Sequence, residues 1–257
     1  MPKDTIAFTL HLADNALIMS QRLSEWTGHG PALEQDIALT NIALDYLGQS
    51  RNFYQHAADI INIKRAMPLF APGRIYPLQE DDLAYHRLEH QFYNHLLVEL
   101  PNMHWGQTVL KTFFFAHYQQ AVYKHLLQDA DPQIAAIAEK SLKEVRYHVK
   151  WSNDWILRLG DGTEESHDKM RDALDKVWPY TGELFEATPW NAERLDREAM
   201  QKEWHENVIS VLQQATLSTP SSGRSQTGGL KGVHTENMGY ILAEMQYLQR
   251  VYPNSNW

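Results

Sequence analysis

The 257-residue chain contains no cysteine, which excludes disulfides, zinc–thiolate sites and thiol nucleophiles. No apolar run approaches the roughly 20 residues that a bilayer-spanning helix needs, and the first residues lack a charged-then-apolar leader. Basic residues are in the minority, with 23 Lys and Arg against 32 Asp and Glu. They are scattered along the sequence, and this argues against a nucleic-acid or anionic-membrane partner. We therefore expect a cytoplasmic protein.

The composition is that of a folded globular protein. Hydrophobic residues make up 43% of the chain and charged residues 21%, which excludes global disorder. A chain of this length can bury one sizeable core, and we predict a single domain over residues 1–257. Eight Trp and twelve Tyr are expected in this core and in a protein–protein interface, where these residues are enriched.

Apolar residues recur at three- and four-residue spacing, which predicts long helices. No period-2 strand pattern and no internal repeat is present, so the predicted fold is an all-α bundle with additional C-terminal helices. Glycine and proline mark the breaks between helices. The predicted helices cover residues 9–26, 31–62, 82–100, 105–128, 132–159, 165–178, 182–185, 195–216 and 235–252. Residues 68–77 and 220–232 are predicted to be irregular.

The segment KEVRYH at residues 143–148 looks like a metal-binding motif that has lost its carboxylate. Helical bundles that hold two irons supply a Glu-x-x-His pair from each of two helices and a lone carboxylate from each of the other two. The residue three before His148 is Val145, which cannot ligate a metal. Two hypotheses follow: an oxygen-activating enzyme, or a bundle that kept this fold and lost the metal.

Two residue pairs could gather around a cation. Asp45 and Gln49 are four residues apart, as are Glu144 and His148, so each pair shares one helix face. A carboxylate-bridged two-metal site needs about four carboxylates and two histidines, and the neutral amide of Gln49 is a poor iron ligand. We therefore predict that these four residues form a metal-free, hydrogen-bonded polar cluster and that the chain has no catalytic residue.

The other predicted helices supply few further ligands. The inner stripe of helix 9–26 offers Ala16 and Met19, whereas Asp14 and Glu25 are predicted to fall off it. On helix 105–128 the nearest polar candidate is His117, which follows three phenylalanines.

Three further patterns have simpler interpretations. The run from His86 to His90 matches the H-x-x-E-H pattern of some zinc peptidases. With thirteen histidines in the chain such a match is weak, and we interpret it as a histidine-rich helix surface. The aromatic residues between Trp105 and Tyr123 are predicted to be core and interface rather than a substrate cavity. The glycine-rich segment 228–232 has neither a P-loop pattern nor a preceding strand.

Five segments together carry a resemblance to a known family. They are SQRLSEW (20–26), DYLGQSRNF (45–53), KEVRYH (143–148), TGGLKGVHTE (227–236) and LAEMQYLQR (242–250). They resemble the C subunits of bacterial phenylacetyl-CoA epoxidases (ring-1,2-phenylacetyl-CoA monooxygenases), which are ferritin-like proteins of aerobic phenylacetate catabolism. The resemblance covers residues 9–257, and only the segment 63–77 is longer than the family pattern.

This resemblance implies a division of labour between subunits. The catalytic A subunit of the family holds the di-iron site and binds the CoA thioester, and the C subunit is its homologue without the metal. The positions matching the A subunit's ligands are Ala16, Tyr46, Gln49, Val145, His148, and either Ala116 or His117. Of these, only His148 is implied to keep its ligand type, which agrees with the ligand count made from the residues alone.

The sequence thus predicts a non-catalytic structural subunit that binds no cofactor of its own. It would pair tightly with the di-iron A subunit, within a complex that also contains a reductase and small subunits. Two alternatives remain. One is an autonomous di-iron or di-manganese oxidase with ligands from Asp45, Glu144, His148 and His117. The other is a free-standing scaffold with no tie to this pathway.

Overall fold

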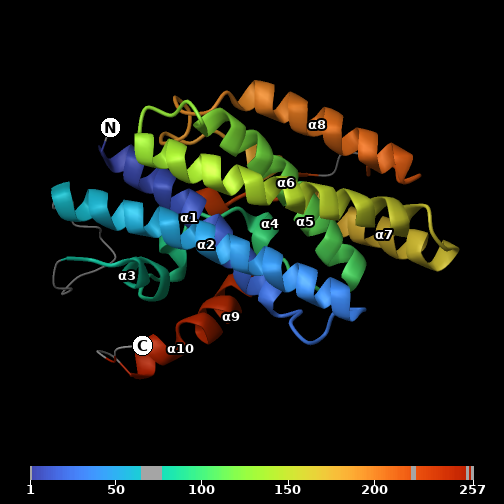
Figure 1. The fold of residues 1–257 in the computed structure, drawn as a ribbon, viewed down its shortest axis with the longest axis horizontal. Helices are drawn as coiled ribbons and strands as arrows, with labels where there is room; N and C mark the ends of the chain where they lie inside the picture. The colour runs from blue at the N-terminus through green and yellow to red at the C-terminus, as the bar shows by residue number, and fades with distance from the viewer. Residues whose placement is uncertain (1, 65–76, 221–223, 253–254, 256–257) are drawn as a thin grey trace.

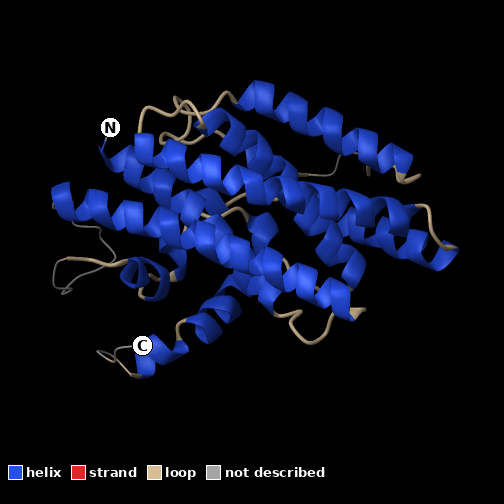
Figure 2. Cartoon of the chain, in the orientation of Figure 1, coloured by secondary structure: helices blue, strands red, loops and turns tan. Residues whose placement is uncertain are grey.

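A computed structural model describes residues 2–64, 77–220, 224–252 and 255. Helices are the only regular elements in these ranges, which contain no strand (Figure 2). The predicted all-α fold is therefore confirmed. No helix within the same ranges combines the length and apolar character that crossing a membrane would require.

Four long helices form a ferritin-like bundle core (Figure 1). They are α1 (Pro2–Ser24), α2 (Leu33–Lys64), α5 (Trp105–Leu126) and α6 (Pro132–Gly160). Helix α1 packs along α2 and α5 packs along α6, while α2 and α6 join the two pairs. The predicted ranges agree with these helices to within a few residues, except that α1 begins at Pro2 instead of residue 9.

Local chemistry explains where α6 begins. The Asp131 carboxylate accepts hydrogen bonds from the backbone N–H groups of Gln133 at 3.0 Å and Ile134 at 3.3 Å. Pro132 occupies the first helical position, where the missing N–H has no intrahelical partner to lose. This N-cap and proline together fix the start of α6.

The predicted helix over residues 82–100 is wrong. The chain forms a short α3 (Glu80–Tyr85), a 3₁₀ turn η1 (Glu89–Gln91) and a short α4 (Leu96–Glu99). The interruption follows from Arg87, whose side chain is fully buried. Its guanidinium donates to the backbone oxygens of Leu83 and Gln91 and forms an ion pair with Asp14. These backbone oxygens would be committed to helical hydrogen bonds in a continuous helix.

The prediction that Asp14 lies off the inner stripe of the first helix is also wrong. Asp14 is fully buried on α1. Its carboxylate accepts hydrogen bonds from the Tyr54 hydroxyl at 2.5 Å and the Tyr93 backbone N–H at 2.8 Å, in addition to those from Arg87. Burial of a carboxylate is stable only when it is paired and hydrogen-bonded in this way.

The remaining helices cover the bundle from outside. Helices α7 (Glu164–Val177) and α8 (Arg197–Gln214) agree with the predicted ranges 165–178 and 195–216 to within a few residues. Both pack against α5 and α6. Between them lie the 3₁₀ turns η2 (Trp178–Tyr180) and η3 (Gly182–Phe185), and η4 (Gly229–Lys231) precedes the C-terminal helices. The predicted helix 235–252 is divided into α9 (Glu236–Met245) and α10 (Tyr247–Val251). Gln246 separates them because its buried side chain donates to the backbone oxygen of Arg87.

The two predicted irregular segments are only partly covered by the structure. Most of segment 68–77, and of the longer segment 63–77 that departs from the family pattern, lies outside the described residues. Segment 220–232 is described at residue 220 and from residue 224 onward. There it is a loop that ends in the turn η4.

Candidate functional site

The four predicted cluster residues meet where α2 packs on α6. The Nε2–H of His148 donates to Oδ2 of Asp45 at 3.0 Å. One turn along both helices, the side-chain amide of Gln49 donates to Oε2 of Glu144 at 2.9 Å. The structure therefore brings these residues together as two hydrogen-bonded pairs, each of which links α2 to α6. We call these four residues the α2–α6 polar pairs.

The pairs extend from the surface into the interior. Gln49 and His148 are buried, whereas Asp45 and Glu144 are partly exposed. On its inner side Gln49 accepts a hydrogen bond from the Tyr123 hydroxyl at 3.0 Å. Burial raises the pKa of Glu144, and the nearby charge of Asp45 adds to this, while the hydrogen bond from Gln49 opposes it. Burial also raises the pKa of Tyr123 well above its usual range, so its hydroxyl stays protonated and donates.

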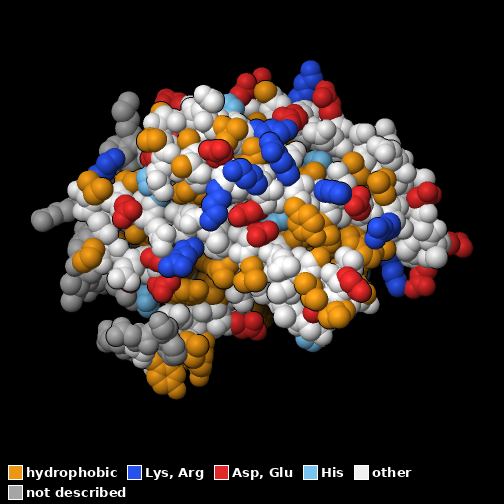
Figure 3. Space-filling view, in the orientation of Figure 1, with side chains coloured by type: hydrophobic (Ala, Val, Ile, Leu, Met, Phe, Trp, Pro, Cys, Tyr) orange, Lys and Arg blue, Asp and Glu red, His pale blue; other side chains and the backbone are white. Residues whose placement is uncertain are grey.

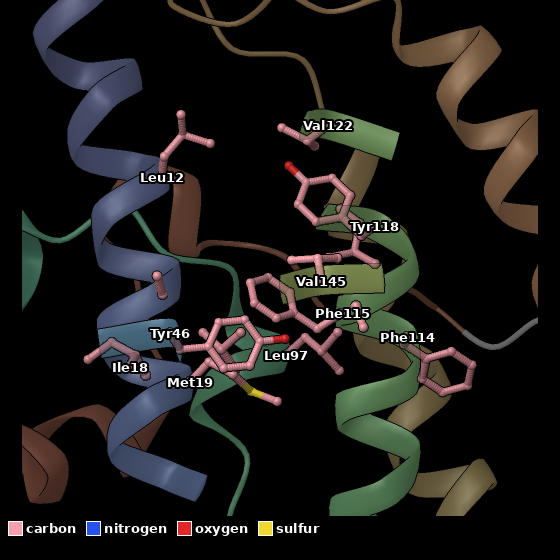
Figure 4. Packing of buried hydrophobic residues seen from close by; sticks show 14 of the residues in the cluster. Leu12, Ile18, Met19, Tyr46, Leu97, Phe114, Phe115, Tyr118, Val122 and Val145 are labelled. Atoms are coloured by element: carbon pink, nitrogen blue, oxygen red, sulfur yellow. The ribbon is translucent and has the colours of Figure 1, made fainter. Parts of the chain in front are cut away.

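The positions between the pairs and the bundle axis are occupied by apolar and aromatic side chains. Figure 4 shows Tyr46, Phe115, Tyr118 and Val145 in the space between α1 and α5. Tyr46 and Val145 have no exposed surface, and neither does Ala16 on α1. The Tyr46 ring lies against the imidazole of His148, with ring centroids 4.8 Å apart. The resemblance matches Ala16, Tyr46 and Val145 to ligand positions of di-iron bundles, and in this chain these positions hold fully buried core side chains.

His117 is bonded elsewhere. Its Nε2 is 2.9 Å from Oδ1 of Asn153 on α6, and its ring packs edge-on against Phe113. Among the residues that the structure describes, no three His, Asp or Glu side chains gather closely enough to hold a metal ion. The donor set of Asp45, Glu144, His148 and His117 therefore does not fit a di-metal centre.

Several buried polar atoms lack a hydrogen-bond partner within the described residues, and two of them belong to the neighbouring rings of Tyr46 and His148. These two atoms are Nδ1 of His148 and the hydroxyl of Tyr46. An unsatisfied buried polar atom costs about 1–3 kcal/mol. No contact of these two atoms within the described residues offsets such a cost.

The H-x-x-E-H segment does not form one helix face. The helix ends at Tyr85, before His86, and His90 lies in the separate turn η1. Glu89 and His90 are exposed as predicted, but the intervening Arg87 is fully buried. Two histidines at i and i+4 can share a zinc ion from one helix only while the helix continues between them, so this segment has the wrong geometry.

The predicted aromatic interpretation is confirmed as far as the core is concerned. Phe113, Phe114 and Phe115 are fully buried within α5, and Tyr118 and Tyr123 are nearly so. All five belong to the continuous hydrophobic core.

Sequence reasoning missed Glu99, which ties the bundle to the C-terminal segment. Its fully buried carboxylate accepts hydrogen bonds from Nδ1 of His234 at 2.7 Å and from the backbone N–H of Thr235 at 2.8 Å. The other ring nitrogen of His234 faces the backbone oxygen of Phe92. Although burial opposes the charged imidazolium, the hydrogen bond and charge of Glu99 raise the pKa of His234. Nothing near Glu99 in the sequence signals a partner 135 residues away.

Glu183 holds the preceding glycine-rich loop. Its carboxylate accepts hydrogen bonds from the backbone N–H groups of Leu96 and Gly228, both at 2.7 Å. Gly232 has φ +73° and its Cα lies close to the backbone oxygen of His90, so that an added Cβ would stand 2.3 Å from that oxygen. A carboxylate of the protein itself thus binds an amide of this loop.

Comparisons with known proteins identify a matching family and a relative. The family model described as "Phenylacetic acid catabolic protein" matches residues 1–257. A protein of Escherichia coli (strain K12), the C subunit of 1,2-phenylacetyl-CoA epoxidase, is 44% identical to this chain over 257 residues. The alignment covers 98% of the chain and 98% of that relative.

Proposed function

We propose that this chain, which belongs to the phenylacetic acid catabolic protein family, is a non-catalytic structural subunit of a phenylacetyl-CoA 1,2-epoxidase. The reaction would take place at the di-iron site of the A subunit, with which this chain would pair tightly. A reductase and small subunits would complete the assembly, in the cytoplasm. The name of the Escherichia coli relative supports membership of a multisubunit enzyme.

The composition of the bundle interior carries this proposal. Tyr46, Val145 and Ala16 stand at positions that the resemblance matches to metal ligands. All three are fully buried, and none of them supplies an ionisable ligand at neutral pH. His148 donates its Nε2 proton to Asp45, so this nitrogen is engaged in a hydrogen bond rather than free to bind a metal. The partnerless Nδ1 of His148 is consistent with a site whose metal was lost in evolution.

The physical role follows from the bundle's rigidity. Side chains of four long helices pack into one continuous core, and the α2–α6 polar pairs tie α2 to α6. Such a body can cover an apolar face of the catalytic subunit and hold its helices in position. A permanent complex of two such bundles would bury upward of about 2,000 Å² in total.

Co-purification with the A subunit tests this proposal, with the metal content assigned to each chain separately. The expected result is a stable complex whose iron resides in the A subunit, while the isolated chain binds far less than one equivalent. If the isolated chain retained near-stoichiometric iron through treatment with a chelator, the autonomous oxidase would be the better hypothesis. If no complex formed, a free-standing scaffold would be favoured.

A further inference from the structure

Helix α2 presents an apolar stripe to the outside. Leu33, Ile37, Leu44 and Leu47 are between 42% and 71% exposed. At 100° per residue their side chains fall within an arc of about 80°, and the stripe extends about 21 Å along the helix. A helix of a bundle usually keeps such an arc for its own core, but α2 uses a different face for that purpose, with Phe53 among its buried residues.

Gly48 lies beside this stripe in the middle of the 32-residue α2. Glycine destabilises a helix interior relative to alanine. Where a helix nevertheless contains a glycine, a neighbouring group usually lies too close for a Cβ. Here the glycine is exposed, and a Cβ built on it would meet nothing within 4 Å. No contact within the described chain therefore requires this glycine. A glycine on an open helix face does allow a second backbone to approach closely.

The neighbouring surface of α6 is basic. Lys140, Lys143, Arg146 and Lys150 are exposed, and the exposed Glu139 and Asp154 lie on the same side of the helix. Positive charges therefore outnumber negative ones on this side. Although basic residues appear scattered along the sequence, their spacing of three and four places them on one side of α6. Figure 3 shows several Lys and Arg side chains along this part of the surface, with some acidic side chains among them and apolar side chains next to them.

The apolar stripe and the basic row border the same junction. The α2–α6 polar pairs lie between them, and Tyr147, which is 48% exposed, follows Arg146 on α6. We call this surface the α2–α6 face. It combines an apolar stripe, a glycine with open space around it and a side of α6 with more basic than acidic residues, on a chain whose net charge is −9.

We propose that the α2–α6 face is the docking surface for the catalytic subunit, and that the partner presents a helix with apolar and acidic side chains to it. This inference rests on the proposed function, which supplies the partner. Acidic side chains on the partner would neutralise the α6 row, whereas a second copy of this acidic chain would be repelled at long range. Close approach of the partner's helix at Gly48 would bring its apolar side chains onto the α2 stripe.

The test measures binding of the purified chain to the full A subunit. Gly48→Trp should weaken binding at least about 30-fold, as expected for a blocked hot spot. Glu206→Trp, at an exposed position of α8, is the matched control and should bind like the wild type. Gly48→Ala should raise the melting temperature of the isolated chain by about 2 °C and still weaken binding. If Gly48 mattered only within this chain, a substitution that raises the melting temperature would not also weaken binding to the A subunit.

The charge row is tested separately. Lys143→Glu combined with Lys150→Glu should slow association about tenfold at low salt and reduce its dependence on ionic strength. Lys202→Glu, at an exposed position of α8, is the control. It should change neither the association rate nor its dependence on ionic strength. The Lys143→Glu, Lys150→Glu double variant and the Lys202→Glu control should both unfold at the same temperature as the wild type.

The outcomes separate the two proposals. If the wild type binds the A subunit and Gly48→Trp binds equally well, the α2–α6 face is not the docking surface but the proposed function stands. If the wild type does not bind the A subunit, both proposals fail. Sedimentation that shows self-association of the wild type, abolished by Gly48→Trp, would identify a second copy as the occupant and overturn the choice of partner.

Discussion

Asp14 on α1 and Arg87 between α3 and η1 form an ion pair in which neither side chain has any exposed surface. Nη1 of Arg87 lies 3.1 Å from Oδ2 of Asp14, and the Tyr54 hydroxyl also donates to this carboxylate. Burial disfavours the guanidinium charge, but Asp14 and Tyr54 more than offset this and raise the pKa of Arg87. This pair anchors the irregular segment between α3 and α4 to the bundle.

Removing one member of this pair should destabilise the protein strongly. We expect Arg87→Met to lower the free energy of unfolding by about 3–5 kcal/mol, because the Asp14 charge is left buried and unpaired. Urea unfolding followed by circular dichroism measures the change. Arg51→Met is the control, since Arg51 is mostly exposed and pairs with Glu80 at the surface, where such pairs contribute less than about 1 kcal/mol. Equal effects of the two substitutions would show that the buried pair has no special role.

The long helices could be predicted well from the sequence because their signals are local. Apolar spacing defines α2 and α5, and Pro132 after an N-capping Asp131 marks the start of α6. The prediction of a helix over residues 82–100 is wrong for the opposite reason. Its local residues favour a helix, but Arg87 is bound to Asp14, 73 positions earlier in the chain. No periodicity within a short window contains that information.

In the candidate site too, contacts signalled by local spacing could be predicted and contacts between distant segments could not. Spacing of four placed Asp45 with Gln49 and Glu144 with His148 on shared helix faces, and the structure brings the two pairs into contact. The tie from Glu99 to His234 could not be found in this way. Each residue is unremarkable within its own segment, and only the packed fold brings them together.

Glu144 should matter for stability through its hydrogen bond. We expect Glu144→Ala to lower the free energy of unfolding by about 1–3 kcal/mol, since the buried Gln49 amide loses its acceptor. Glu144→Gln should be nearly neutral, because an amide oxygen can accept the same hydrogen bond. Assembly with the A subunit should fall with stability, whereas turnover per assembled complex should stay unchanged. Normal assembly with abolished turnover in Glu144→Ala would contradict a purely structural role.

The pH dependence at Glu144 should run opposite to that of an ordinary paired carboxylate. Its pKa is raised in the folded chain, chiefly by burial, so the folded state holds its proton at a pH where the unfolded state has released it. The contribution of Glu144 to stability therefore decreases as the pH rises through the interval between the two pKa values. The Glu144→Gln variant should lack this contribution in urea unfolding measured across acidic pH.

Gly232 should be intolerant of a side chain. Its φ of +73° is strained for other residues, and a Cβ would stand 2.3 Å from the backbone oxygen of His90. We expect Gly232→Ala to lower the free energy of unfolding by more than about 2 kcal/mol. Gly28→Ala measures the cost of the left-handed backbone conformation alone, because Gly28 has φ +83° with nothing within 4 Å of an added Cβ. It should cost about 1 kcal/mol, and a Gly232→Ala effect no larger than this would rule out the predicted clash.

Mild acid should destabilise the protein through His11. This histidine is buried on α1, donates from Nδ1 to the backbone oxygen of Tyr93 at 2.7 Å, and packs edge-on against His95. Burial lowers the pKa of His11 to about 4, and burial also lowers the pKa of His95 well below its usual range.

The sign follows from proton uptake on unfolding. Between the usual histidine value of 6.5 and about 4, the unfolded chain binds a proton at His11 that the folded chain excludes. The free energy of unfolding should therefore fall as the pH decreases through this interval, by on the order of 3 kcal/mol for this residue. His234 opposes this trend, because its pKa is raised in the folded chain and its contribution is lost as the pH rises.

Comparison of the wild type with His11→Asn, which keeps a donor near the Nδ1 position, isolates the contribution of His11. Urea unfolding at several values from about pH 7 to about pH 4.5 should show a shallower loss of stability in the variant. Parallel curves for the two proteins would mean that His11 takes up its proton equally in both states. In that case the acid sensitivity would have to come from carboxylates such as Asp131, whose pKa is lowered in the folded chain because the hydrogen bond and charge of His56 outweigh its partial burial.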